Sequence, residues 1–342
     1  MHVGPQSAGS TPGPVSYGRG GTEPTITDAN LVLGRLNPAH FLGGEMQLDV
    51  NAAAESIRQR VAEPLGYTGQ DGLIQMADGI IAIAVVVMAG AIRKVSVEHG
   101  LDPRDFVLFS YGGGGPLHAC ALAHELSVPT VVIPPEPGNF SAIGMLLADA
   151  RIDSSKTFVG LLDEKSVGAM NDLFGALEKD ATAALAAEFG TSDVFFERHA
   201  EMRYRGQRHN IKVPVTGLQD AAAIRQAFER DYRRRYGHAD AKAAAEFQAV
   251  HVYAFARLQQ PEIARLPRAK AAPQGAVTRP VYFKSAGGMV DAKIYNRDSL
   301  EPGFTGAGPA VIEEYGSTTV VWPGDRFEIG ALGEIRIQCA AN

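Results

Sequence analysis

The feature that most constrains the fold is an apolar strand pattern that breaks into four glycines and continues as a helix. It runs from Phe106 to Cys120, and the glycines are Gly112, Gly113, Gly114 and Gly115. Glycine has no Cβ, so such a junction brings backbone N–H groups close to a ligand, and the positive end of the helix favours an anion such as phosphate. Tight packing of a helix on a strand also produces such turns, so this segment alone leaves both interpretations open.

The residues after the glycines predict a parallel βαβ unit. A helix is expected over 117–126, and Pro129 precedes a β-branched strand over 130–133. Two strands joined by a crossover helix run parallel. The loop 134–140 would then lie at the carboxyl end of the second strand, which is the edge where open α/β sheets bind ligands.

Changes of pattern along the chain predict three domains. Residues 1–153 begin with a glycine- and proline-rich loop and carry helices from 27, over 49–63 and over 72–99, followed by the βαβ unit. Residues 154–264 predict an α+β domain, with helices over 163–189 and 218–236 and strands over 194–204, 209–215 and 247–258. Residues 265–342 predict a β-rich region of short strands after a linker at 266–275.

Composition and charge exclude several classes of protein. The chain has 342 residues, of which 45% are hydrophobic, enough for two or three domains with their own cores. A net charge of −6 argues against a nucleic-acid partner. The first residues show no secretory signal, and the apolar run 79–92 is too short to span a bilayer, so we expect a core helix, no membrane partner and a cytoplasmic location.

Cysteines and histidines give no metal or disulfide signal in the sequence. Cys120 and Cys339 are far apart in unlike surroundings, which suggests neither a disulfide framework nor a cysteine-based metal site. His118 and His124 are six residues apart, so on one helix they point to different sides.

The sequence offers three candidate carboxylates, Asp28, Glu313 and Glu314. Asp28 lies in a tight polar loop before a helix, where it would either hold a metal or substrate or cap the helix. For Glu313 and Glu314, between a strand and a turn, we favour one carboxylate pointing outward and one paired locally.

Nine segments together resemble the later part of the hydantoinase A/5-oxoprolinase family, which includes N-methylhydantoinase, 5-oxoprolinase and ketone-carboxylase subunits. The resemblance spans essentially the whole chain. It rests on the Gly-Pro-Gln-Ser-Ala-Gly of 4–9, on the Thr-Asp-Ala of 27–29, on the glycine turn, and on residues 12–14, 17–22, 137–144, 203–207, 236–238 and 308–314.

The resemblance implies a fold and a chemistry. The fold would be α/β, a partial ATPase lobe of the actin, heat-shock chaperone and sugar-kinase group, followed by an α+β domain and a β-rich C-terminal region. The family uses ATP and Mg²⁺ to phosphorylate a carbonyl oxygen, which activates it for attack by water or for carboxylation. The glycine turn, Gly112 to Gly115, and His118 would contact the nucleotide, Asp28 would be catalytic, and the metal ligands stay unassigned.

The resemblance also implies partners. Family members carry an upstream lobe with an Asp-Gly-Gly-Thr phosphate loop, and that loop does not occur in these residues. We therefore expect another chain to carry that lobe and a hydantoinase B-like subunit to complete the reaction. Three functions stay open: a subunit of an ATP-dependent cyclic amidase, which we favour, a subunit of a ketone carboxylase, and a non-catalytic or truncated member of the family.

Overall fold

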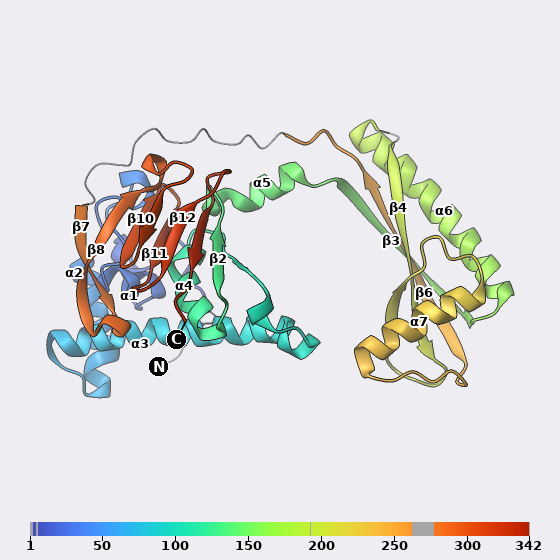
Figure 1. Ribbon diagram of the computed structural model, residues 1–342, viewed down its shortest axis with the longest axis horizontal. Coiled ribbons are helices and arrows are strands. Elements are labelled where there is room, and N and C mark those ends of the chain that lie inside the picture. The colour runs from blue at the N-terminus through green and yellow to red at the C-terminus, as the bar shows by residue number, and fades with distance from the viewer. Residues whose placement is uncertain (1–2, 5, 192, 262–276, 342) are drawn as a thin grey trace. The chain divides into compact units, whose positions relative to one another are not determined.

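The computed structural model describes residues 3–4, 6–191, 193–261 and 277–341, which form two compact units (Figure 1). Unit 1 comprises Met1–Gly144 and Glu262–Asn342, and unit 2 comprises Met145–Pro261. The expected linker at 266–275 lies outside the described residues.

Unit 1 contains two sheets. The first has the order β1-β2-β13-β12-β9 and the second the order β11-β10-β8-β7. The strands are β1 Leu108–Phe109, β2 Thr130–Ile133, β7 Val277–Phe283, β8 Gly288–Asn296, β9 Thr305–Ala307, β10 Ala310–Glu314, β11 Ser317–Val321, β12 Arg326–Ile329 and β13 Ile335–Gln338.

The expected βαβ unit is confirmed. Strand β1 pairs parallel with β2, in the register Leu108 to Val131, and helix α4 (Gly115–Leu126) connects them. On its other side β2 pairs antiparallel with β13, so that Ile133 lies opposite Ile335. The C-terminal strands thus extend the sheet begun by β1 and β2, whereas the sequence predicted a separate domain from residue 265. The reason is burial, because Val131 and Ile133 are fully buried and an inner strand needs a partner on both edges.

The helices of unit 1 pack around these sheets. They are α1 Ile26–Val32, α2 Val50–Ile57, α3 Gly69–Val95, α4 and α5 Phe140–Leu147, and α5 ends past the boundary of the unit. Short turns of 3-10 or π type are η1 Val15–Tyr17, η2 Leu42–Gly44, η3 Arg58–Ala62, η4 Glu63–Leu65, η5 Val97–His99, η6 Pro103–Asp105, η7 Pro137–Asn139, η8 Lys284–Ala286 and η9 Arg297–Ser299.

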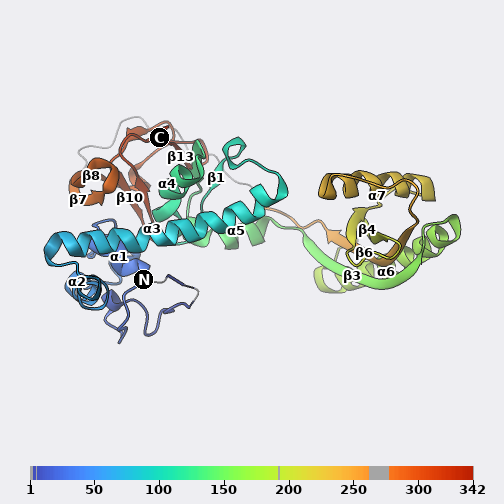
Figure 2. The ribbon, with the colours of Figure 1, turned by 90° about the horizontal axis from the view of Figure 1, so that it is seen from below.

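Helix α3 is buried where it contacts α1, α2 and α4, and exposed on the rest of its surface. It lies between α1 and α2 on one side and α4 with the sheets on the other (Figure 2). Ile80, Ile81 and Ala84 are buried, whereas Val86 and Val87 are more than half exposed. The expectation of a buried core helix therefore holds for one face. By length and composition Gly69–His99 is apolar enough to cross a membrane, a test that core helices of soluble proteins also pass.

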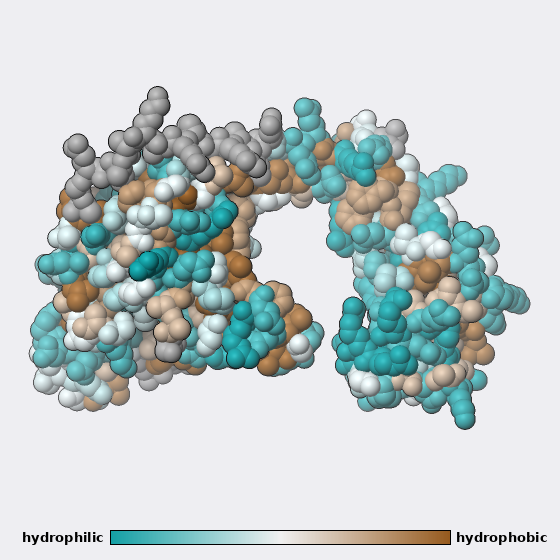
Figure 3. All heavy atoms as spheres, viewed as in Figure 1, coloured by the Kyte–Doolittle hydropathy of each residue, from teal (hydrophilic) through white to brown (hydrophobic). Residues whose placement is uncertain are grey.

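Unit 2 is a four-stranded antiparallel sheet with two long helices. The strand order is β3-β6-β4-β5, and the elements are β3 Ala150–Leu161, α6 Glu164–Phe189, β4 Val194–Tyr204, β5 Ile211–Pro214, α7 Ala221–Tyr236 and β6 Ala245–Ala256. Alternate residues of β6 are buried, so one face of the sheet packs on the helices. The visible outer face of this unit is mainly hydrophilic (Figure 3). The α+β character agrees with the sequence, which did not predict strand β3.

Candidate functional site

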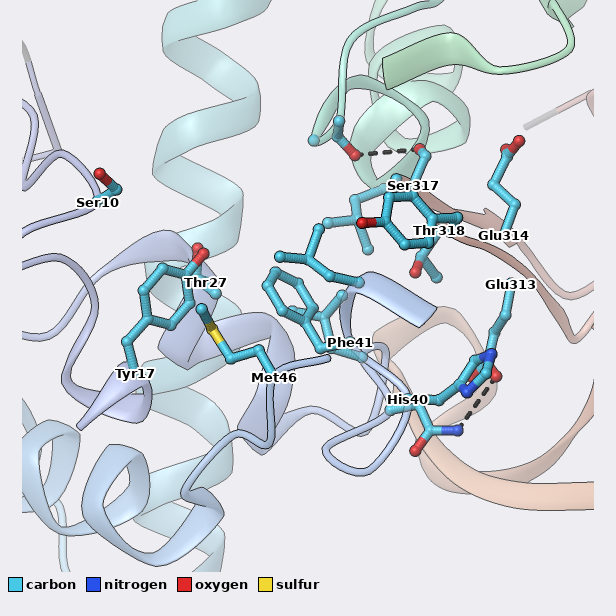
Figure 4. Close-up of a pocket in the computed structure, with 18 of the residues that line it drawn as sticks. Ser10, Tyr17, Thr27, His40, Phe41, Met46, Glu313, Glu314, Ser317 and Thr318 are labelled. Carbon is cyan, nitrogen blue, oxygen red and sulfur yellow. Dashed lines mark hydrogen bonds between the residues drawn. The ribbon is translucent and has the colours of Figure 1, made fainter. Parts of the chain in front are cut away.

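A cavity of about 450 Å³ lies within unit 1, beside the glycine turn (Figure 4). Its wall comes from the loop before α1, from the segment that follows α1, from the glycine turn and from the β10–β11 hairpin. The lining residues are Ser10, Tyr17, Arg19, Thr27, Leu36, Asn37, His40, Phe41, Leu42, Met46, Gly113, Gly114, Leu117, Glu313, Glu314, Tyr315, Gly316, Ser317 and Thr318. Of the residues expected at the site, Gly113 and Gly114 line this cavity.

The glycine turn presents the amino end of α4 to the cavity. Gly114 is the N-cap residue and has no side chain that could accept from the first turn of the helix. The first N–H groups of a helix lack partners within it, so in α4 those of Gly115 and Leu117 are available to an anion, while Pro116 has none. Gly112 adopts a φ of 87°, which glycine tolerates, and its N–H donates to the Pro137 carbonyl at 2.6 Å. The turn is thus fixed by its neighbours and open on one side.

The β10–β11 hairpin sets the distance between the turn and the opposite wall. The Ser317 hydroxyl donates to the Gly113 carbonyl at 3.1 Å. A Cβ added to Gly113 would lie 3.2 Å from the Gly316 carbonyl oxygen, whereas one added to Gly114 would meet nothing within 4 Å. Gly113 is therefore needed for close packing on the hairpin, while a side chain at Gly114 would extend into open space.

Asp28 does not line the cavity, and its carboxylate is occupied by the chain itself. It accepts hydrogen bonds from the backbone N–H groups of Ser16 and Thr25, both at 2.8 Å, and of Val15 at 3.2 Å, as well as from the Thr25 hydroxyl. Thr25 and Asp28 form a capping box at the start of α1. Of the two interpretations left open, the geometry favours helix capping, and Asp28 supports the turn that places Tyr17 in the cavity wall.

His118 faces the core instead of the cavity. Its side chain is buried on α4, and its Nδ1 atom has no hydrogen-bond partner among the described residues. Burial, together with the nearby Arg35 guanidinium, lowers the pKa of His118 to about 4. The imidazole is therefore neutral at physiological pH, and contact with a nucleotide would require the side chain to leave its buried position. Gly112 and Gly115, the first and last glycines of the turn, do not line the cavity either.

Two adjacent glutamates at the end of β10 contribute the carboxylates of the cavity. Their side chains extend in opposite directions, as expected for neighbours on a strand, with Glu313 toward His40 (Figure 4). Glu313 is held by Arg279 Nη1 at 2.7 Å and by Asn37 Nδ2 at 3.1 Å. The local pairing of Glu313 agrees with the sequence, but the expectation that the other carboxylate points outward is wrong, because Glu314 is paired with Arg297 and buried.

Glu314 is the most perturbed acid in the cavity wall. Burial raises its pKa to about 7, even though Arg297 at 3.2 Å acts in the opposite direction and lowers it. Both side chains of this pair are more than 90% buried, so the loss of hydration outweighs the attraction. A carboxyl group with a pKa near neutrality can give or take a proton. The sequence signal was the Glu-Glu pair itself, but its burial was not visible there.

Family models match almost all of the chain. The hydantoinase/oxoprolinase model matches residues 1–154, and the hydantoinase/oxoprolinase C-terminal domain matches residues 163–335. The chain belongs to the hydantoinase/oxoprolinase family. The resemblance derived from the short motifs is thereby confirmed.

Relatives and solved structures agree with this family. The caprolactamase subunit alpha of Pseudomonas jessenii is 35% identical over 96% of this chain and 48% of its own length. The crystal structure of the ATP-dependent caprolactamase from the same organism superposes with a TM-score of 0.80 and 34% identity, over 98% of this chain and 49% of that one. The nucleotide-free structure of acetone carboxylase gives a TM-score of 0.76 and 28% identity over the same shares. The α/β fold is therefore that of ATP-dependent enzymes of this family, and the chain spans about half the length of the relatives it matches.

Proposed function

We propose that this chain is part of an ATP-dependent cyclic amidase and that its glycine turn binds the phosphates of the nucleotide. The observation that carries the proposal is the uncapped amino end of α4, which opens on the cavity at Gly113 and Gly114. Family membership supports ATP as the ligand, and the similarity to caprolactamase supports a cyclic amide as the substrate.

The residues present suit a nucleotide. Backbone N–H groups at a helix start satisfy phosphate oxygens without a charged side chain, and Gly114 leaves room for close approach because no atom lies within 4 Å of the place its Cβ would take. Tyr17, Phe41 and Met46 give the other side of the cavity an apolar surface. Such a combination of apolar walls and a few polar groups is typical of small-molecule sites.

In the proposed mechanism, bound ATP would supply the phosphoryl group that activates the amide oxygen, and a bound Mg²⁺ would supply positive charge to its phosphates. The chain's own residues would position the phosphates and stabilise their charge. The backbone amides at the start of α4 would hold phosphate oxygens, and Ser317 fixes the turn that carries these amides. Glu313 and Glu314 are the carboxylates of the cavity wall that would hold the metal ion directly or through water. Asp28, which the family resemblance placed in catalysis, is proposed here to have a supporting role, because its oxygens already accept backbone hydrogen bonds.

The proposed function requires the upstream lobe and a second subunit, and we propose that the protein acts in the cytoplasm. Since the chain spans about half of its relatives, the phosphate loop of the upstream lobe would come from the remaining part of the family architecture, carried by this polypeptide or by another chain. A hydantoinase B-like subunit would complete ring opening, in keeping with relatives that are named as subunits. Two free thiols, Cys120 and Cys339, support a cytoplasmic location.

Ketone carboxylation is the second candidate. It is supported by the superposition on acetone carboxylase and by 31% identity to the acetophenone carboxylase gamma subunit of Aromatoleum aromaticum. Both reactions begin with an activated oxygen, so the same glycine turn serves either one. The higher identity to the caprolactamase subunit makes the cyclic amidase our first choice.

The test uses the native complex, purified with the subunits that accompany this chain. ATP hydrolysis is measured with hydantoins, 5-oxoproline, caprolactam, and alkyl or aryl ketones with bicarbonate. We expect hydrolysis that depends on a cyclic amide, and loss of it in Gly114→Val, because the new side chain occupies the phosphate position. Gly175→Val on α6, where a Cβ also meets nothing within 4 Å, is the matched control. Unchanged KM for ATP in Gly114→Val would refute the assignment of the turn, and turnover with ketones alone would select carboxylation.

A further inference from the structure

Three side chains with metal-binding atoms meet at the far end of α4 from the glycine turn. One ligand atom from each of His124, Asp325 and Cys339 lies within 4.8 Å of the others. The buried Cys120 thiol neighbours the Cys339 sulfur but does not belong to this group of three donors. The proposed function uses none of these residues.

The cluster joins distant parts of unit 1. Cys120 and His124 are four residues apart on α4 and so share one face of the helix. Asp325 precedes β12, and Cys339 follows β13. The sequence suggested neither a disulfide framework nor a cysteine-based metal site; the structure shows the two cysteines as free thiols and as neighbours, although they are far apart in the chain. The i, i+4 spacing of Cys120 and His124 was the signal available in the sequence.

The side chains are held in place before any ion binds. Asp325 is fully buried, and its carboxylate accepts from the Ala340 N–H at 2.8 Å and lies 3.0 Å from His124 Nε2. The His124 ring packs against Trp322, with 5.4 Å between ring centroids. A carboxylate fixed by a backbone amide and an imidazole fixed by an indole have little freedom to turn away.

The distances suit a tetrahedral ion. Zinc binds nitrogen and oxygen at about 2.0 Å and sulfur at about 2.3 Å, so the donors of a tetrahedral site are about 3.3–3.8 Å apart. The three donor atoms of this cluster all lie within 4.8 Å, so shifts of about 1 Å would close them around an ion. A sulfur and an imidazole beside the carboxylate favour zinc over magnesium or calcium, which prefer oxygen ligands alone.

We infer that His124, Asp325 and Cys339 bind a structural zinc ion that ties the end of helix α4 to the C-terminal strands of the same sheet, and that the neighbouring Cys120 thiol moves to complete the tetrahedral set. With the Cys120 sulfur as fourth donor the site would be closed, as in structural zinc sites, and would leave no position for a substrate. The ion would be bound far along α4 from the cavity and independently of ATP. The inference therefore does not depend on the proposed function.

The first experiment measures metal content in the protein without an affinity tag. The full chain, with any subunits that accompany it, is passed over a size-exclusion column with a weak chelator and analysed by inductively coupled plasma mass spectrometry. We expect close to one zinc ion per chain, and strongly reduced zinc in His124→Ala and Cys339→Ser. His99→Ala, which removes an exposed histidine of the same unit, should keep the metal. Wild-type protein that neither contains zinc nor takes it up on titration would overturn the inference.

Cobalt substitution keeps the inference testable if a variant does not fold. Wild-type chain stripped of metal and titrated with Co²⁺ should develop the strong visible bands of a tetrahedral ion together with thiolate-to-cobalt charge transfer, saturating at one equivalent. Added zinc should also raise its thermal midpoint. A weak octahedral spectrum without sulfur charge transfer, or a disulfide between Cys120 and Cys339 in protein purified under anaerobic conditions, would contradict a zinc site.

Discussion

Replacing Asp28 with alanine separates a supporting role from a catalytic one. In the structure the carboxylate accepts three backbone N–H groups, from Val15, Ser16 and Thr25, and the Thr25 hydroxyl. Alanine would leave all of them without this acceptor, which costs most where the donor is buried away from water. We therefore expect the main effect of Asp28→Ala to be on stability.

The magnitude follows from the burial of each donor. An orphaned buried donor costs about 1–3 kcal/mol. Ser16 is 1% exposed and would bear the full cost, whereas Val15 and Thr25 are half-buried and would be partly rehydrated. The sum is about 3–5 kcal/mol. For a domain of roughly 200 residues this lowers the thermal midpoint by about 10 °C.

Differential scanning calorimetry of the full chain measures this effect. Asp49→Ala is the matched control, because Asp49 caps α2 with one exposed hydrogen bond to Ala52 and should cost only about 1 kcal/mol. A thermal midpoint for Asp28→Ala equal to that of the wild type, combined with loss of ATP-dependent activity in the complex, would refute the supporting role. It would restore Asp28 as a catalytic residue.

Three further predictions concern the residues around the glycine turn. Burial raises the pKa of Glu314 to about 7, so the folded chain binds this proton more tightly than the unfolded chain. The stability that this proton contributes is complete below pH 4.5 and is lost as the pH rises to 7. In urea unfolding, Glu314→Gln should reduce the fall in unfolding free energy over this pH range by about 3 kcal/mol, and an unchanged dependence of that free energy on pH would contradict the prediction. Burial lowers the pKa of His118 to about 4, so the stability that the neutral ring contributes is lost as the pH falls from 6.5 to 4, the opposite direction to Glu314. An NMR titration should show no protonation of His118 above pH 5. A titration midpoint near 6.5 would show that the ring is exposed. Ser317→Ala removes the hydrogen bond to the Gly113 carbonyl, so it should raise the KM for ATP severalfold and lower the stability by about 1 kcal/mol. The neighbouring variant Thr318→Ala should change the KM for ATP less. Equal effects of the two variants on KM would argue against a role of the Ser317 hydrogen bond.

Much of the site could be predicted at the level of segments. The glycines, the Glu313-Glu314 pair and the Thr-Asp-Ala motif are all visible in the sequence, and the structure places each of them in or beside the cavity wall. Their roles were harder to predict, because a role depends on what a side chain contacts. Asp28 contacts backbone amides and His118 the core, and neither contact has a local signal. The pKa of Glu314 depends on burial by residues from other parts of unit 1.

The sequence by itself determined the local elements: the β-branched run of β2, the glycine turn and the amphipathic α6 and α7, because hydrophobic periodicity and glycine content act over a few neighbouring residues. Only the tertiary structure decided which elements share a sheet, and it joined β13 to β2 across about two hundred residues of chain. It also brought Cys120 and Cys339 together at the end of α4. Such pairings depend on long-range packing and on the exclusion of water, and a linear pattern carries neither.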